Sequence, residues 1–214
     1  ASNGRCHLLG ASDVRLTIGS QGTEGTNDAN WIRGEGVNLM FNSASGNHTW
    51  EVGGTEKLRL QSGGGLSFNG DNAAANALDD YEEGTWTPAF SGETTTNFSY
   101  ASNTGGSYVK IGRFVWAHGR IQLSANNGSG NLKLTGLPFT VGNAQSGTSG
   151  YEGDLTTGYV DNAQSGTSGP TGVAIESQTH VELWHSISNG NGSTWTAAEM
   201  DNTVTWSFSV FYNV

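Results

Sequence analysis

The sequence is poor in cysteine, proline and charge. It has one cysteine, Cys6, so no disulfide can form within the chain, and it has only 3 prolines in 214 residues. Charged residues make up 13%, about half the share of roughly 25% that is usual for globular domains. This composition lacks both the charge density of a disordered chain and the Ala/Glu/Lys/Leu bias of a helical bundle. Stability must come from packing or from assembly.

Basic residues are also scarce. Nine Lys and Arg face 19 Asp and Glu, which gives a formal net charge of −10. Binding to a phosphate backbone needs clustered basic residues, so we expect no nucleic-acid partner. No apolar run approaches the ~18 residues of a membrane span, and we expect no membrane insertion. Because the chain begins with Ala, we expect it to be a fragment or processed product, with its anchoring region in a missing N-terminal part before Ala1 or in a partner protein.

Glycine is abundant, with 33 residues, and some of these glycines recur in a short repeat. The stretches "TWEVGGTE" (49–56), "KLRLQSGG" (57–64) and "GLSFNGDN" (65–72) each alternate polar and apolar residues and contain glycine. Burying two apolar side chains stabilises by about 3–6 kcal/mol, whereas ordering eight residues costs roughly 8–16 kcal/mol. We therefore expect residues 1–78 to form a β shaft in which other copies supply the opposing faces. The alternative is a monomeric meander that covers part of a larger sheet.

Longer strands follow from Thr85 onward. The stretch 106–124 predicts a hairpin that turns near Gly112 and Arg113, and 172–177 with 180–187 predicts a second. The last stretch alternates strictly, with apolar residues at the even positions 204–212. These patterns indicate an all-β protein in which residues 85–214 form an antiparallel β-sandwich or jelly-roll-like head. Helical turns are expected only at 73–78 and 196–200.

Between the two regions, "ALDDYEEGTWTP" (77–88) places Asp79, Asp80, Glu82 and Glu83 within five residues. Neither a Ca²⁺ loop nor a glycosidase carboxylate pair fits adjacent acids at a domain joint well. We interpret 79–84 as an acidic hinge with solvated side chains, and Trp86 as the anchor of the first head strand. No metal site is expected there.

Catalytic motifs are missing from the sequence. It has no phosphate-binding glycine loop, HExxH, CxxC or G-x-S-x-G pattern, and its five histidines are scattered. We expect no catalytic residues, no cofactor and no enzymatic activity.

Candidate contacts to a partner lie in the loops of the second region. "VGNAQSGTSG" (141–150) recurs as "VDNAQSGTSG" (160–169), which favours a variable binding loop or a tolerated tandem copy. Trp116, Trp184 and Trp206 fall within strands and are expected in the core, whereas Trp195 follows a Gly/Asn loop and is expected to be exposed. The candidate receptor contacts are Trp195, Tyr151, Tyr159, Asn143, Gln145, Asn162 and Gln164.

The stretch "ALDDYEEGTWTPAF" resembles a segment of bacteriophage tail-fibre and other virion proteins, especially those of marine and cyanobacterial phages. "GSYVKIGRFVWAHGRIQLS" and "LTGLPF" resemble the next landmarks of that domain, and "GGTEKLRLQSGGGLSFNG" is similar to the repeats before it. The resemblance covers roughly residues 50–140. It implies a homotrimeric, intertwined virion fibre with a knob, and it transfers no catalytic residue.

The sequence therefore predicts a virion fibre protein, in the tail or on the capsid, that acts outside the cell. Its head would bind a host glycan or surface protein, and a region before Ala1 would join other virion proteins. A purely structural fibre or decoration protein, whose knob drives trimer assembly, is the alternative. A polysaccharide-degrading tailspike ranks last.

Overall fold

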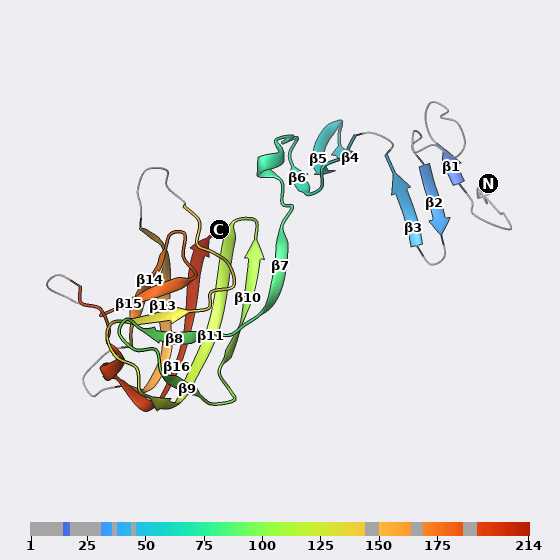
Figure 1. The fold of residues 1–214 in the computed structure, drawn as a ribbon. Helices are drawn as coiled ribbons and strands as arrows, with labels where there is room; N and C mark the ends of the chain where they lie inside the picture. Colours follow the sequence, from blue (N-terminus) through green and yellow to red (C-terminus); the bar gives the residue numbers. More distant parts are fainter. Residues whose placement is uncertain are drawn as a thin grey trace. The chain divides into compact units, whose positions relative to one another are not determined.

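The computed structural model describes residues 15–17, 31–35, 38–43, 46–143, 150–163, 169–185 and 192–214. The chain divides into two compact units, Ala1–Asp79 and Asp80–Val214 (Figure 1). Each unit is built from antiparallel strand pairs, so the expected all-β class is confirmed. Helical structure in the described residues is limited to two single 3-10 turns, and neither could cross a membrane.

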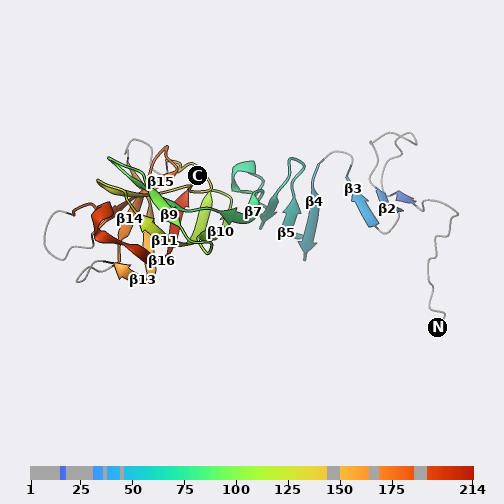
Figure 2. The same cartoon turned by 60° about the horizontal axis from the view of Figure 1, so that its bottom comes forward.

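The first unit holds two small sheets of three strands each (Figures 1 and 2). The first contains β1 (Arg15–Thr17), β2 (Trp31–Glu35) and β3 (Asn38–Asn42), and the second contains β4 (His48–Val52), β5 (Thr55–Leu60) and β6 (Leu66–Phe68). Gly53 and Gly54 join β4 to β5 with φ of 61° and 72°. A two-residue turn with positive φ at both positions matches strand twist, and glycine adopts it without strain. The turn η1 (Ala74–Asn76) follows this meander.

The second unit holds one curled sheet of ten strands, here called the head sheet (Figure 2). Its order is β7-β10-β11-β16-β13-β14-β15-β12-β8, with β9 paired to β11. The sheet is continuous in its hydrogen bonding, so the sandwich-like packing arises within one sheet rather than between two. The strands are β7 (Tyr81–Trp86), β8 (Ala89–Gly92), β9 (Phe98–Tyr100), β10 (Gly105–Ile111), β11 (Phe114–Asn126), β12 (Leu132–Thr135), β13 (Tyr151–Ala163), β14 (Thr171–Ile175), β15 (His180–Trp184) and β16 (Met200–Asn213).

The core of this unit follows the alternation of its last strand. Successive even positions of β16 are buried from Val204 to Tyr212, as the sequence pattern predicts. The Trp206 ring lies 4.2 Å from the Phe208 ring and 5.7 Å from the Phe90 ring, between ring centroids. All of the buried hydrophobic side chains in the described residues lie between Trp86 and Tyr212. The curled sheet therefore encloses its own core.

The two predicted hairpins are present. Gly112, with φ of 57°, and Arg113 connect β10 to β11, and residues 176–179 connect β14 to β15. One expectation about the core is wrong: Trp116, in the middle of the first hairpin, is 43% exposed. It points to the outer face of the sheet, because its neighbours Val115 and Ala117 take the inward positions.

Candidate assembly surface and receptor-contact residues

The sheet of β4, β5 and β6, here called the repeat sheet, has an unburied apolar face. Leu58 pairs with Trp50 and Phe68, and Leu60 pairs with His48 and Leu66, so these side chains share one face. Leu78 extends this face through a bridge to Leu66. Leu58, in the middle strand, is partly buried, whereas five other large apolar side chains of this face remain between 37% and 52% exposed: Trp50, Leu60, Leu66, Phe68 and Leu78.

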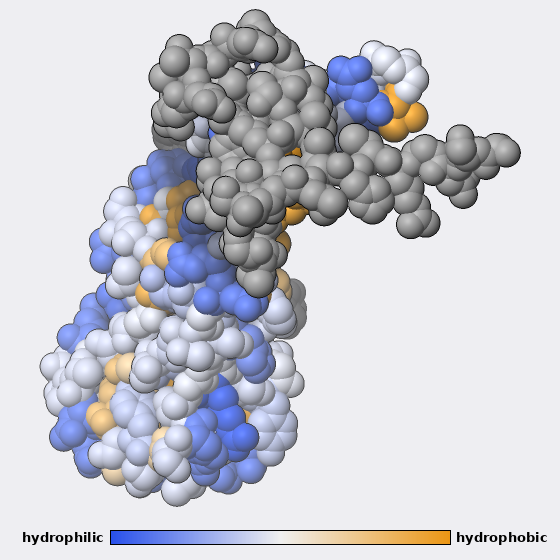
Figure 3. Space-filling model, turned by 90° about the vertical axis from the view of Figure 1, so that its right-hand side faces the viewer, coloured by the Kyte–Doolittle hydropathy of each residue, from blue (hydrophilic) through white to orange (hydrophobic). Residues whose placement is uncertain are grey.

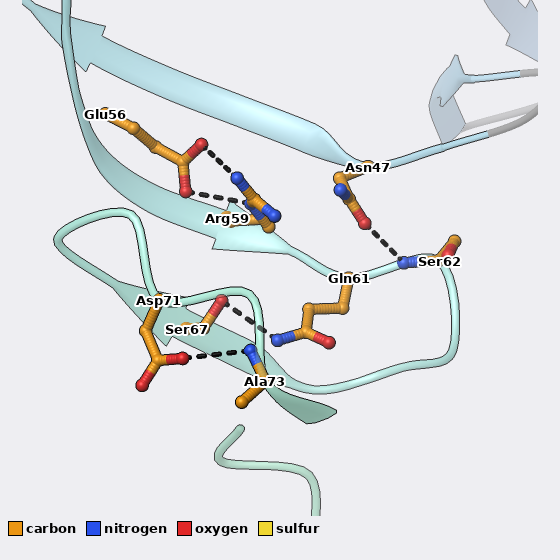
Figure 4. Close-up of polar contacts among 8 residues, drawn as sticks. All are labelled: Asn47, Glu56, Arg59, Gln61, Ser62, Ser67, Asp71 and Ala73. Carbon is orange, nitrogen blue, oxygen red and sulfur yellow. Dashed lines mark hydrogen bonds and ion pairs between the residues drawn. The ribbon is translucent and has the colours of Figure 1, made fainter. Parts of the chain in front are cut away.

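The opposite face of the repeat sheet is polar and internally bonded (Figure 4). Arg59 donates from Nε and Nη2 to the two Glu56 carboxylate oxygens, at 2.8 and 2.5 Å. Gln61 Nε2 donates to Ser67 Oγ at 3.2 Å, and Ser67 is the one buried residue among those of the first unit whose burial is described. Polar groups on this face are therefore satisfied within one chain, whereas the apolar face is not.

A hollow of about 630 Å³ adjoins the apolar face. It is lined by Phe41 of β3 together with His48, Thr49, Trp50 and Leu60. Phe41 is itself 60% exposed, and its neighbour Leu39 is 64% exposed. Apolar side chains reach the surface between hydrophilic ones in Figure 3. The first unit thus presents apolar side chains from both of its sheets to the solvent.

The acidic segment, interpreted from the sequence as a hinge over 79–84, contains the boundary between the two units after Asp79 and then continues into a strand. Residues 81–86 form β7, an edge strand that pairs along its whole length with β10. The strand register puts Trp86 inward, at 7% exposed, as predicted for an anchor residue. Trp86 donates from Nε1 to the His118 carbonyl oxygen at 2.9 Å. Acidic residues on an edge strand discourage pairing with a further chain, which gives these side chains a structural reason.

The acidic side chains also form ion pairs and hydrogen bonds with other side chains, which fully solvated side chains would not do. Asp80 forms an ion pair with Lys110, whose side chain is buried. Glu82 accepts a hydrogen bond from the Tyr108 hydroxyl at 2.5 Å, and this bond raises the pKa of Tyr108. Gly84 makes room for that ring, since a Cβ there would lie 2.7 Å from Tyr108 Oη.

Glu83 accepts a hydrogen bond from Tyr81 at 2.9 Å, which raises the pKa of Tyr81. Asp79 ends the first unit, beside Gly65. Three of the four acids thus fix side chains at one end of the head sheet.

Among the candidate receptor contacts, Tyr151 lies beside a pocket. This residue begins β13 and is 66% exposed. Together with Val173, Trp184 and Gly192 it lines a shallow, largely apolar pocket of about 280 Å³. The Trp184 indole N–H is buried without a hydrogen-bond partner among the described residues. Trp184 was expected in the core. Its side chain is instead only partly buried, and it forms one wall of this pocket.

Tyr159 and Asn162 lie further along the same strand. Tyr159 is 55% exposed and pairs with Ser207, and Asn162 stands at a strand irregularity with φ of 59°. Eight residues separate Tyr151 from Tyr159, which amounts to about 26 Å along a strand. The structure therefore does not gather these candidates into one site.

The duplicated segments begin in different surroundings. Asn143, in the first copy, donates from Nδ2 to Glu176 Oε1 at 2.7 Å, and its carbonyl accepts from Arg113 Nη2 at 3.2 Å. Asn162, at the equivalent place in the second copy, lies within β13. Gln145 and Gln164 lie outside the described residues.

The expectation that Trp195 is exposed is wrong, because its side chain is fully buried. Its backbone N–H donates to the Leu183 carbonyl at 2.9 Å, and its carbonyl accepts from the Leu132 N–H at 2.7 Å. The ring stacks on His185, with centroids 4.8 Å apart. The Gly/Asn composition before Trp195 suggests a loop, but residues 194–196 pair with neighbouring strands and carry the ring inward.

No group of three or more His, Cys, Asp or Glu in the described part of the chain is arranged to hold a metal ion. His185 Nε2 lies 2.9 Å from Glu199 Oε1, next to the turn η2 (Ala197–Glu199). Glu199 also accepts from the Thr196 backbone N–H at 2.7 Å, so it serves as a local cap.

Comparison with known proteins gives a distant structural likeness. No known protein family and no curated protein matches the sequence. A solved structure described as "Crystal structure of Dettilon tailspike protein (gp208)" is similar at 17% identity with a TM-score of 0.48. The match covers 62% of this chain and 24% of the tailspike, so this chain spans about a quarter of that protein's length. A TM-score below 0.5 does not establish a common fold.

One sequence-based expectation has to be corrected on this finding. The sequence was expected to encode no enzyme, with a tailspike as its last alternative, yet the similar structure is a tailspike. The exclusion of enzymatic activity is therefore withdrawn. At the same time, nothing in the described residues gives positive evidence of an enzymatic activity.

Proposed function

We propose that this chain is a fibre protein of a bacteriophage virion, in which several copies wind their first units into a shaft and present the second units as heads. The resemblance of residues 50–140 to phage fibre proteins implies three copies. The observation that carries the proposal is the apolar face of the repeat sheet, with Trp50 and Phe68 each about half exposed.

The physical argument for assembly is the imbalance between the two faces of that sheet. Arg59, Gln61 and Ser67 on the polar side are satisfied within the chain. On the apolar side no core forms, and a three-stranded sheet with one open apolar face is marginal alone. Burying roughly half of five large side chains would stabilise each copy by about 4–7 kcal/mol. Further copies of the same chain supply matching faces without any other component.

We further propose that the heads contact the host surface, in the tail or on the capsid, with a glycan or a surface protein as the partner. The pocket beside Tyr151 supports this, because the aromatic walls of Tyr151 and Trp184 offer stacking faces. Weak contacts of single heads would add up through several copies on one virion. A structural fibre without receptor binding remains the competing outcome.

Two measurements test this proposal. Light scattering of the intact chain gives the number of copies, and a mass of one copy would overturn the shaft. Competition of the purified protein with virions for adsorption to host cells tests the head. We expect Tyr151→Ala to reduce competition about tenfold and Tyr159→Ala, its matched control on the same strand, to leave it unchanged. No competition by the native protein at any concentration would favour the structural role.

A further inference from the structure

The pocket beside Tyr151 lies on the outer face of the head sheet, around Val173 of β14. Tyr151 pairs with Ile175, two residues to one side of Val173. Trp184 pairs with Thr171, two residues to the other side, so the two aromatic side chains flank Val173 from opposite directions. The volume of about 280 Å³ is below the ~300–1,000 Å³ of pockets for drug-sized ligands. The pocket therefore fits one small chemical group.

The lining of this pocket offers ring carbons and aliphatic atoms. None of the described residues that line it is charged: Tyr151, Val173, Trp184 and Gly192. The Trp184 indole N–H is buried, so the exposed part of that ring has no hydrogen-bond donor. Gly192 leaves the six-membered ring of Trp184 uncovered, because a Cβ at this position would lie 3.1 Å from Trp184 Cε3. The lining therefore offers few partners to a ligand that needs hydrogen bonds.

Two carboxylates lie on either side of the pocket floor. Asp154 and Glu182 are the direct cross-strand neighbours of Val173, so their Cα atoms lie about 5 Å from that of Val173. Neither forms an ion pair within the described part of the chain, and the next base in the register is Lys133, on the far side of Glu182. Burial and Lys133 lower the pKa of His180, so this histidine is neutral near pH 7. The rim of the pocket is therefore net negative.

An aromatic pocket with a negative rim matches a cation that has no hydrogen-bond donors of its own. A cation within about 6 Å of a Trp or Tyr ring face is attracted by the ring quadrupole. A primary ammonium or a sugar hydroxyl would leave donors unpaired against the apolar lining, which costs free energy, whereas a quaternary ammonium has no N–H group to satisfy. The two carboxylates repel an anionic group.

We propose that the pocket beside Tyr151 binds a quaternary ammonium group carried by a molecule of the host surface. This inference names the ligand class of the receptor contact in the proposed function and rests on that proposal. The rings of Tyr151 and Trp184 contact the methyl groups of the ammonium, and Val173 forms the floor beneath them. Asp154 and Glu182 balance the positive charge from the rim.

The test compares choline with 3,3-dimethylbutan-1-ol, which has the same shape but carries carbon in place of the charged nitrogen. Each compound is titrated against the intact chain, and binding is followed by the broadening of the ligand's methyl NMR signals. We expect choline to bind with a dissociation constant of about 1 mM and the neutral isostere to bind about tenfold more weakly. Equal affinities of the two compounds, or no binding of choline, would overturn the inference.

Two matched pairs of variants place the site. Tyr151→Ala should weaken choline binding about tenfold, and Tyr159→Ala, which removes an exposed ring further along the same strand, should leave it unchanged. Asp154→Asn should weaken choline binding about threefold without affecting the neutral isostere. Asp161→Asn, at another exposed acid of β13, should affect neither compound. Equal effects within either pair of variants would contradict the proposed site.

The outcomes separate this inference from the proposed function. Native protein that blocks virion adsorption but shows no preference for choline over its isostere would overturn the inference and leave the receptor role intact. Protein that prefers choline but never blocks adsorption would overturn the receptor role, and the ligand class of the pocket would stand. Tighter binding of choline phosphate than of an Nε-trimethyllysine peptide would indicate a glycan or lipid substituent, and the reverse order a surface protein. Either order supports the ligand class.

Discussion

The two units of this chain use the same strand chemistry with opposite results. In the head sheet, alternating strands place one face against a core that includes Trp206, Phe208 and Tyr212 at 0–2% exposure. In the repeat sheet, alternation is equally regular, but Trp50 and Phe68 stay about half exposed. The difference lies in strand length and number: ten strands can curl around their own apolar face, and three short ones cannot. Regular alternation therefore predicts that one face of a sheet is buried. It does not tell whether the same chain or another chain covers that face.

The largest expected effect comes from breaking the apolar face of the repeat sheet. Trp50→Ser with Phe68→Ser removes two half-exposed rings, worth about 2–3 kcal/mol per copy and roughly 6–9 kcal/mol in a trimer. We expect analytical ultracentrifugation to show dissociation into single chains at micromolar concentration. Thr49→Ser, on the polar face, is the control. Oligomers of unchanged affinity in the double variant would show that this face does not hold the copies together.

Next in size is the loss of a ring from the head core. Trp86→Ala removes the edge-on contact with Phe208, at 6.1 Å between centroids, and the hydrogen bond to the His118 carbonyl. We expect the free energy of unfolding of the second unit to fall by about 3–5 kcal/mol in urea titrations. Tyr159→Ala should change it by less than about 0.5 kcal/mol. Equal losses in the two variants would contradict the assignment of Trp86 as an anchor.

A smaller effect is expected from the acidic segment. Asp80→Asn leaves the buried Lys110 ammonium facing a neutral amide, and we expect a loss of about 1–2 kcal/mol because Asp80 itself is half exposed. Asp79→Asn is the matched control, with no loss expected. If both variants unfold at the same urea concentration as the native protein, the acids are solvated as the sequence first suggested.

The smallest effect is a pH dependence at Glu199. Burial opposes the charged form of this carboxyl, but hydrogen bonds from Thr196 and the nearby His185 outweigh it and hold the pKa below its usual range. A lowered folded-state pKa contributes stability above the unfolded value of about 4.3, and this contribution disappears as pH falls through the folded-state pKa. Urea midpoints of the native protein and Glu199→Gln should differ at pH 7 and converge toward pH 3. A constant difference over that range would refute the linkage.

Particular residues show which features of the structure the sequence predicts. The strict alternation of residues 204–212 predicts β16 and its buried face, and Gly112 predicts the turn of the first hairpin. Trp116 and Trp195 were assigned to the wrong environments, because strand membership does not tell which face is covered and loop composition does not reveal pairing with distant strands.

The contacts of the acidic segment could not be predicted from the sequence for a related reason. Asp80 and Glu82 owe their places to Lys110 and Tyr108, about 30 residues away in sequence, and local composition carries no sign of these partners. The pocket beside Tyr151 likewise depends on Val173, Trp184 and Gly192, which the order of the sheet brings together.

The mass of the intact chain in solution tests the central claim most directly. One copy has a mass of 22.4 kDa, and light scattering over a range of concentrations reports the assembled mass without reference to shape. We predict a stable species of three times that mass, which persists on dilution to nanomolar concentration. A stable species of 22.4 kDa would contradict the account, because the apolar face of the repeat sheet would then remain open to water.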